Sequence, residues 1–106
     1  MSRIAVIAVI EVLPGRKAAL LSALMAHRAR CLKDEPGTLE LEVLEPLDDE
    51  TKFLVYEAYL NRAAFDVHVK GPSLAQFRRE SADAIAKFSA TRCAVLDDES
   101  LFASAK

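Results

Sequence analysis

The chain has 106 residues, and its 14 lysines and arginines against 16 acidic residues give a formal charge of −2. This length suits one domain, because two halves would each be too small to bury a useful core. Hydrophobic residues at 52% and charged residues at 28% exclude a disordered chain. The balanced charge gives no indication of a basic surface that would bind nucleic acid. No stretch reaches the roughly 20 apolar residues of a membrane span.

The N-terminal third predicts a strand followed by a helix. Residues 4–12 are almost continuously apolar and rich in Val and Ile, which indicates a strand buried on both faces. The break at residues 14–15 is Pro-Gly and not a small-residue cleavage site, so we expect no signal peptide and a cytoplasmic protein. Residues 16–33 contain neither Gly nor Pro and place apolar side chains, with His27 among them, at helical spacing.

The remaining two thirds predict two strands, two further helices and a last strand. Residues 38–45 alternate apolar and acidic side chains, and residues 52–60 form an apolar run. A short helix over residues 62–68 precedes a Gly-Pro break, and the next helix opens at Ser73 with an apolar stripe that reaches residue 88. A short strand over residues 92–96 follows. The order β-α-β-β-α-β predicts an α+β, ferredoxin-like domain.

This domain spans residues 1–96, and residues 97–106 form an acidic C-terminal tail. Helices on one face of such a sheet leave its other face open, yet residues 4–12 and 53–60 carry apolar side chains for both faces. A short chain has no further element to cover this face, but a second copy of the chain can bury it. We therefore expect a homodimer through the sheet faces. The alternative is a monomer with an exposed apolar sheet.

The sequence offers no cofactor or metal motif. Cys31 and Cys93 stand 62 positions apart, and we expect two free thiols in a reducing compartment. His27 and His68 fall on different predicted elements, and no acidic or histidine triad has metal-ligand spacing. The three glycines form no phosphate-binding loop, so we expect neither a cofactor nor a metal.

Three short stretches resemble the antibiotic biosynthesis monooxygenase family of dimeric α+β barrels. They are Glu-Pro-Gly-Thr-Leu at 35–39, Phe-Leu-Val-Tyr-Glu-Ala-Tyr at 53–59 and Ala-Ala-Phe-Asp-Val-His at 63–68, within a resemblance that covers residues 3–96. The resemblance implies a homodimer whose sheets face each other, with a pocket between sheet and helices in each subunit. Many members carry a second His five residues after the first, where this chain has Ser73.

Two residues are candidates for catalysis. The imidazole of His68 suits removal of a proton from a phenol or an enolisable carbonyl, although a helix-terminal structural role is the alternative. Glu57 stands in an apolar strand, where a carboxylate is costly unless it is paired or functional. Its structural alternative is an ion pair with one of three arginines, namely Arg78, Arg79 or Arg92.

Four further residues are candidates for substrate binding. Strand alternation puts Tyr59 on the same face as Glu57 and Tyr56 on the opposite face. Phe65 lies one helical turn before His68, so we expect its ring beside the imidazole. His27 lies on the apolar stripe of the first helix, where a satisfied core histidine is the alternative.

The resemblance implies a cofactor-independent monooxygenase acting on a small aromatic, phenolic or polyketide-like substrate. Such an enzyme removes a proton, and the resulting carbanion reacts directly with dioxygen. Two alternatives stay open. One is an isomerase of a phosphorylated, sugar-like carbonyl compound, for which Lys70 is a possible cation at the pocket mouth. The other is a non-catalytic barrel that binds a small hydrophobic molecule, which the loss of the second His favours.

Overall fold

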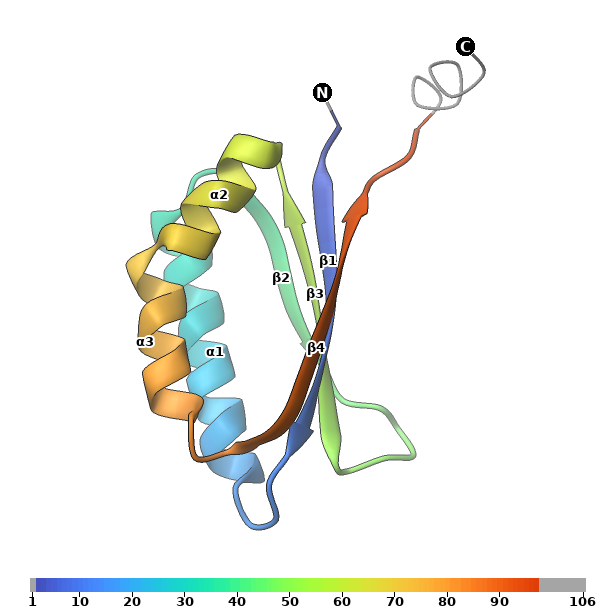
Figure 1. Ribbon diagram of the computed structural model, residues 1–106, viewed down its shortest axis with the longest axis vertical. Coiled ribbons are helices and arrows are strands. Elements are labelled where there is room, and N and C mark those ends of the chain that lie inside the picture. Colours follow the sequence, from blue (N-terminus) through green and yellow to red (C-terminus); the bar gives the residue numbers. More distant parts are fainter. Residues whose placement is uncertain (1, 98–106) are drawn as a thin grey trace.

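The computed structural model describes residues 2–97, so all but the first residue of the predicted tail lies outside the described residues. An antiparallel four-stranded sheet in the order β2-β3-β1-β4 carries all helices on one face (Figure 1). This arrangement confirms the ferredoxin-like α+β fold. The elements are β1 (Ile4–Val12), α1 (Lys17–Asp34), β2 (Thr38–Leu44), β3 (Lys52–Tyr59), α2 (Arg62–Lys70), α3 (Pro72–Ser81) and β4 (Ile85–Ala94).

The C-terminal part differs from the sequence-based prediction. The helix predicted to reach residue 88 ends at Ser81, and β4 begins at Ile85, seven residues before the predicted strand. A turn closed by the hydrogen bond from the Ala84 amide to the Ser81 carbonyl separates the two elements. Beyond it, β4 pairs with the whole length of β1. The backbone hydrogen bonds of this long pairing outweigh the local preference of the Ala-rich segment for helix.

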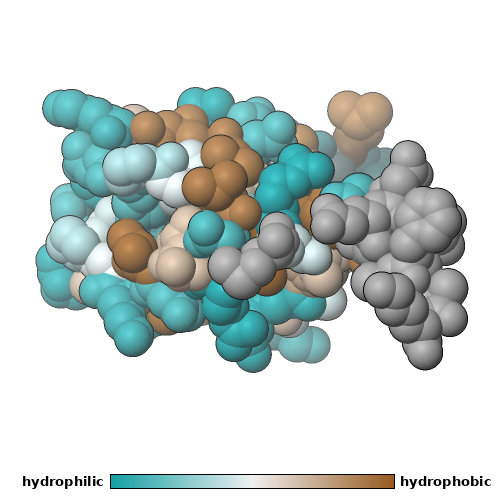
Figure 2. All heavy atoms as spheres, turned by 90° about the horizontal axis from the view of Figure 1, so that it is seen from above, coloured by the Kyte–Doolittle hydropathy of each residue, from teal (hydrophilic) through white to brown (hydrophobic). Residues whose placement is uncertain are grey.

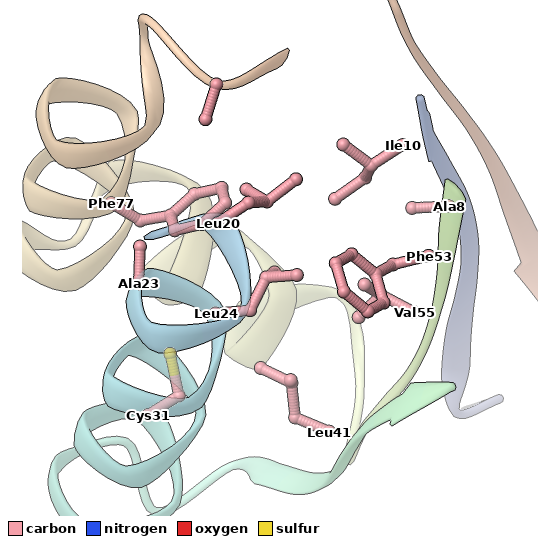
Figure 3. Close-up of a cluster of buried hydrophobic side chains, with 11 residues drawn as sticks. Ala8, Ile10, Leu20, Ala23, Leu24, Cys31, Leu41, Phe53, Val55 and Phe77 are labelled. Atoms are coloured by element: carbon pink, nitrogen blue, oxygen red, sulfur yellow. The ribbon is translucent and has the colours of Figure 1, made fainter. Parts of the chain in front are cut away.

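The main core lies between α1 and the sheet. Figure 3 shows side chains of α1 directed at side chains from β1, β2 and β3. The large residues that meet there are Leu20, Leu24, Ile10, Leu41 and Phe53, all buried. Burial of each such side chain contributes about 1.5–3 kcal/mol to the free energy of unfolding. Cys31 continues the buried row of α1 toward the end of the sheet at which α2 lies.

The face of the sheet away from the helices is apolar in its middle, is flanked by polar residues such as Glu42 and Thr91, and is only partly covered. Ile7 is 50% exposed and Leu44 is 47% exposed, and strand register groups them with Val9, Leu54 and Tyr56 on this outer face. The prediction that the first strand is buried on both faces therefore fails for a single chain, because no helix lies on this side (Figure 1).

Apolar side chains also reach the surface around α2. Val67 and Val69 of this helix are exposed, and apolar groups interrupt the hydrophilic surface in the view from this end (Figure 2). Within residues 2–97, every helix is too short or too polar to cross a bilayer.

Candidate active site

A cavity of about 590 Å³ opens between the sheet and the helices α2 and α3. Its wall is mainly apolar, and it includes two titratable groups that face each other, Glu57 of β3 and His68 of α2. An apolar hollow with a few convergent polar groups is the usual form of a small-molecule site. The main apolar residues of the wall are Val6, Phe65, Leu74, Phe77, Ile85 and Phe88.

The Glu-Pro-Gly-Thr stretch after α1 positions α2 against the sheet. Gly37 lies so close to α2 that a Cβ atom there would collide with Cβ of Ala64. Asn61 caps α2, because its side-chain oxygen accepts a hydrogen bond of 2.9 Å from the Ala64 amide. These two contacts set the direction of α2, and the helical spacing of three then places both Phe65 and His68 on its inner face.

His68 is held by a carboxylate on the side away from the cavity. Glu35 Oε1 accepts hydrogen bonds from the Thr38 hydroxyl at 2.8 Å and from His68 Nδ1 at 2.9 Å. Because Glu35 Oε1 is the acceptor in both bonds, Nδ1 of His68 must carry a proton. The neutral imidazole therefore has its lone pair on Nε2. No residue between 2 and 97 hydrogen-bonds to Nε2, whose nearest acidic atom is Glu57 Oε1 at 3.5 Å.

Glu57 lies on the cavity wall with Tyr59 beside it. The Tyr59 hydroxyl donates a hydrogen bond to Glu57 Oε1, as expected for two residues on one face of a strand. Burial raises the pKa of Glu57, and this hydrogen bond and His68 partly offset the rise. Burial and the neighbouring Glu57 also raise the pKa of Tyr59, so Tyr59 stays protonated. The predicted ion pair of Glu57 with an arginine does not form in the part of the chain that the structure describes.

The second imidazole lies behind the cavity wall. His27 Nδ1 is hydrogen-bonded to Ser73 Oγ at 2.9 Å, and the same oxygen accepts a hydrogen bond from Arg30 Nε at 2.9 Å. The His27 ring stacks on Phe77 at 5.1 Å between centroids, and Phe77 separates it from the cavity. Burial lowers the pKa of His27 to about 4, with further lowering by His68 and Arg30. His27 is therefore a neutral core residue near pH 7.

Ser73, the position at which many family members resembling this chain carry a second His, does not line the cavity. Ser73 is buried and lines a separate hollow between α1 and the junction of α2 and α3. Its hydroxyl holds His27 and Arg30 in place. Ser73 therefore has a structural role here.

Cys31 lies between the two imidazoles. Its Sγ is 3.6 Å from His27 Nδ1 and 3.7 Å from His68 Nδ1, and donor atoms of the three residues lie within 4.8 Å of one another. Within residues 2–97, this trio is the set that could hold a metal ion. A metal would have to displace the hydrogen bonds of His27 and His68 and deprotonate a thiol whose pKa burial raises to about 12. Both cysteines are free thiols, as predicted.

The fold brings together some of the predicted site residues and separates others. Phe65 lines the cavity with Glu57 and His68, but its ring packs edge-on against Tyr59, and the rings nearest His68 are those of Tyr59 and His27. Tyr59 lies behind Glu57 and is fully buried. Tyr56 points to the outer face of the sheet, because it alternates with Glu57 along β3.

Sequence reasoning missed three residues of the site. Glu35 enters the sequence analysis only as part of the stretch at 35–39, although a carboxylate between a helix and a turn can bind an element that packs there. Cys31 stands one helical turn after His27, a spacing that places both on one face of α1. Ser73 is predicted as the start of a helix and as the position of a missing histidine, but the sequence does not indicate its contact with His27.

The fold and site define a ferredoxin-like α+β domain with a carboxyl-imidazole pair on an apolar cavity. Solved structures of other proteins share this fold. Rv0793 from Mycobacterium tuberculosis is 26% identical with a TM-score of 0.82, and the match covers 92% of this chain and 98% of that one. PA3566 from Pseudomonas aeruginosa is 23% identical with a TM-score of 0.82, covering 92% and 97%. A Nitrosomonas europaea protein that bears the name of the antibiotic biosynthesis monooxygenases is 23% identical with a TM-score of 0.84, covering 92% and 93%.

Residues 3–80 match the sequence model of the family Antibiotic biosynthesis monooxygenase, and the chain belongs to that family. Among curated proteins, the uncharacterized protein sll1783 from Synechocystis is 34% identical over 55 residues. That alignment covers 52% of this chain and 37% of the relative, so the chain matches well under two thirds of the relative's length.

Proposed function

We propose that this protein is a monooxygenase that removes a proton from a small aromatic or polyketide-like substrate and lets the carbanion react directly with dioxygen. The observation that carries the proposal is the meeting of His68 Nε2 and Glu57 on the wall of a mainly apolar cavity. Membership of the antibiotic biosynthesis monooxygenase family supports the same class of reaction.

His68 is the base in this proposal. Glu35 holds the Nδ1 proton, which orients the ring and leaves the lone pair of Nε2 directed toward Glu57 and the cavity. When Nε2 takes a proton, the carboxylate of Glu35 stabilises the imidazolium. Glu57 lies 3.5 Å from Nε2, and its burial raises its own pKa, so it can share the proton that His68 receives.

The reaction that fits this base converts an activated methylene to a carbonyl. The methylene loses one proton to His68, the carbanion passes an electron to dioxygen, and the two radicals combine to form a carbon–oxygen bond. The distal peroxide oxygen takes the proton back from His68. Loss of the second methylene proton and cleavage of the oxygen–oxygen bond then give the carbonyl and water. The methylene supplies all four electrons, two for the inserted oxygen and two for water.

The cavity orients the substrate and excludes water from it. Its apolar wall suits a flat ring system, and the phenyl rings of Phe65, Phe77 and Phe88 come from three different elements. Removal of water raises the reactivity of a carbanion and protects it from reprotonation by solvent. Holding the reacting carbon beside Nε2 lowers the entropic part of the barrier.

The proposed working form is a homodimer in which two outer sheet faces pack together. Ile7 and Leu44 are about half exposed on this face, and they form one surface with Val9, Leu54 and Tyr56. A second copy would bury this apolar surface by a two-fold, self-complementary contact. Tyr56 then belongs to the interface and not to the substrate site.

A binding protein without turnover is the second candidate. The hydrogen bonds that join Thr38, Glu35 and His68 favour it, because they satisfy buried polar groups and would persist without any chemistry. In that case the cavity would bind the same class of apolar ligand and release it unchanged.

Oxygen uptake tests the proposal. Purified protein is incubated with a panel of hydroquinones and with anthrone, whose methylene lies between two aromatic rings and is acidified by a carbonyl. With anthrone, we expect one dioxygen consumed per anthraquinone formed, one atom of ¹⁸O from labelled dioxygen in that product, and loss of this activity in His68→Ala. Lys70→Ala is the matched control, since Lys70 lies two residues further along α2 and does not line the cavity. Uptake that never exceeds the protein-free rate, or that persists in His68→Ala, would contradict the proposal.

A further inference from the structure

Two arginines stand on the rim of the cavity. Arg78 comes from α3 and Arg92 from β4, and both line the cavity while remaining exposed. Glu57, the one carboxylate on the cavity wall, is hydrogen-bonded to Tyr59 and lies beside His68 instead. Across residues 2–97, neither Arg78 nor Arg92 has a carboxylate within ion-pair distance. The two cations are therefore not neutralised by a carboxylate of residues 2–97.

This separates Arg78 and Arg92 from most other arginines of the chain. Arg16 pairs with Asp83, Arg28 with Glu42, Arg30 with Glu80 and Arg62 with Asp66. Cations at the rim of an apolar hollow direct part of their field into it, because low-dielectric walls focus field lines. A guanidinium presents a planar fork of donors that fits a carboxylate by two parallel hydrogen bonds. The rim therefore favours an anionic group on the ligand.

The sheet register places this cationic rim away from the acid–base pair. Glu57, Val6 and Arg92 form one row across β3, β1 and β4, and they point to the same face. Neighbouring strands lie about 4.8 Å apart, so the Cα atoms of Glu57 and Arg92 are separated by about 10 Å. The apolar side chain of Val6, which lines the cavity, lies between them. A ligand that reaches both ends has its anionic group and its reacting carbon on opposite sides of a ring system.

The geometry points to a substrate that is an aromatic carboxylate, bound with its ring in the apolar cavity and its carboxylate between Arg78 and Arg92. This inference rests on the proposed function for the identity of the reacting end, near His68. It assigns a carboxylate to the other end of the substrate. It also explains how a flat ring with few polar groups is held in one orientation.

A pair of ligands that differ mainly in charge tests the inference. The probes are 1-hydroxy-2-naphthoate and its methyl ester, and their affinities are measured by calorimetric titration, which needs no turnover. We expect the acid to bind about tenfold more tightly than the ester at low salt, as a charge-assisted hydrogen bond provides. Arg78→Gln and Arg92→Gln should each remove most of this preference and leave the affinity for the ester unchanged. Arg79→Gln is the matched control, because Arg79 neighbours Arg78 on α3 but does not line the cavity.

The inference is overturned if the ester binds as tightly as the acid, if Arg79→Gln loses as much affinity as Arg78→Gln, or if neither probe binds at millimolar concentration. The result also separates this inference from the proposed function. If the protein prefers the acid through Arg78 and Arg92 but consumes no oxygen, the inferred carboxylate site stands and the proposed monooxygenase function fails.

Discussion

Glu35 and His68 are joined by a hydrogen bond of 2.9 Å between Oε1 and Nδ1, although 33 residues separate them in the sequence. Glu35 ends α1 and His68 lies in the last turn of α2, so the bond ties the two helices together beside the cavity. The side chain of His68 is only 5% exposed and that of Glu35 only 8%, so their contact is shielded from water. The imidazole therefore has a fixed orientation and a fixed tautomer.

Glu35→Gln should reduce kcat of the proposed reaction by about tenfold or more and leave KM almost unchanged. The amide still accepts a hydrogen bond from Nδ1 but no longer stabilises the imidazolium that forms in the transition state. Glu35 does not line the cavity, so substrate binding is spared. Thr38→Val is the control, because it removes a hydrogen bond to the same carboxylate oxygen without touching the imidazole. An equal loss of kcat in both variants would reduce Glu35 to a structural residue.

Sedimentation at micromolar concentration should show a dimer, with an interface above the roughly 1,000 Å² of a specific contact. Ile7→Glu should shift the protein toward the monomer, because it places a charge in the centre of the outer face. Val67→Glu, at a similarly exposed apolar side chain on α2, should leave the dimer intact. A wild-type protein that sediments as a monomer would exclude the proposed assembly.

The two cysteines should differ sharply toward a thiol reagent at pH 8. Cys93 is partly exposed and should react within minutes, whereas Cys31 is fully buried and should react only on unfolding. Burial raises the pKa of Cys31 to about 12, so the reactive thiolate is scarce as well as inaccessible. Cys93→Ser should keep full activity, and Cys31→Ala should cost about 1–3 kcal/mol of stability. Complete loss of turnover in a folded Cys93→Ser protein would show that this thiol takes part in the chemistry.

The neutral His27 should make the fold sensitive to acid. Its pKa of about 4 in the folded protein lies below the ordinary value of 6.5, so the unfolded chain binds more protons between these two values. The free energy of unfolding therefore falls as the pH drops through this window, by about 1–2 kcal/mol between pH 7 and pH 5 from His27 alone. Denaturant titrations of wild type and His27→Gln at both pH values isolate this contribution. The same pH dependence in both proteins would show that His27 is not the source.

Most of the fold could be predicted from the sequence because its elements carry strong periodic patterns. The bounds of the first strand and the first helix agree with the structure to within one residue. The start of β4 is predicted wrongly. Residues 85–88 continue the helical apolar stripe of the preceding segment, and only their pairing with another strand makes them part of β4. Their partner is β1, some 75 positions away, and no local pattern reports such a contact.

The site was less accessible to sequence reasoning than the fold. Glu57 stands out as a charge in an apolar strand, and alternation correctly places Tyr59 beside it. Glu35 gives no such signal, because a carboxylate at a helix end is usually solvated and becomes a partner of His68 only through packing of α2. His27 and His68 lie on different helices, yet their ring centroids are 5.4 Å apart. Distances between elements depend on tertiary packing, which spacing along the chain does not encode.

The central claim is that His68 removes a proton in the transition state, and the separate measurement of kcat and KM for His68→Ala tests it most directly. With the best substrate of the oxygen-uptake panel, we expect kcat to fall by about 100-fold or more and KM to change by less than about threefold. Tyr56→Phe, on the same strand as Glu57 but on the opposite face, provides the control and should retain both constants. A rise in KM with kcat preserved would contradict the claim and make His68 a residue that only binds the substrate.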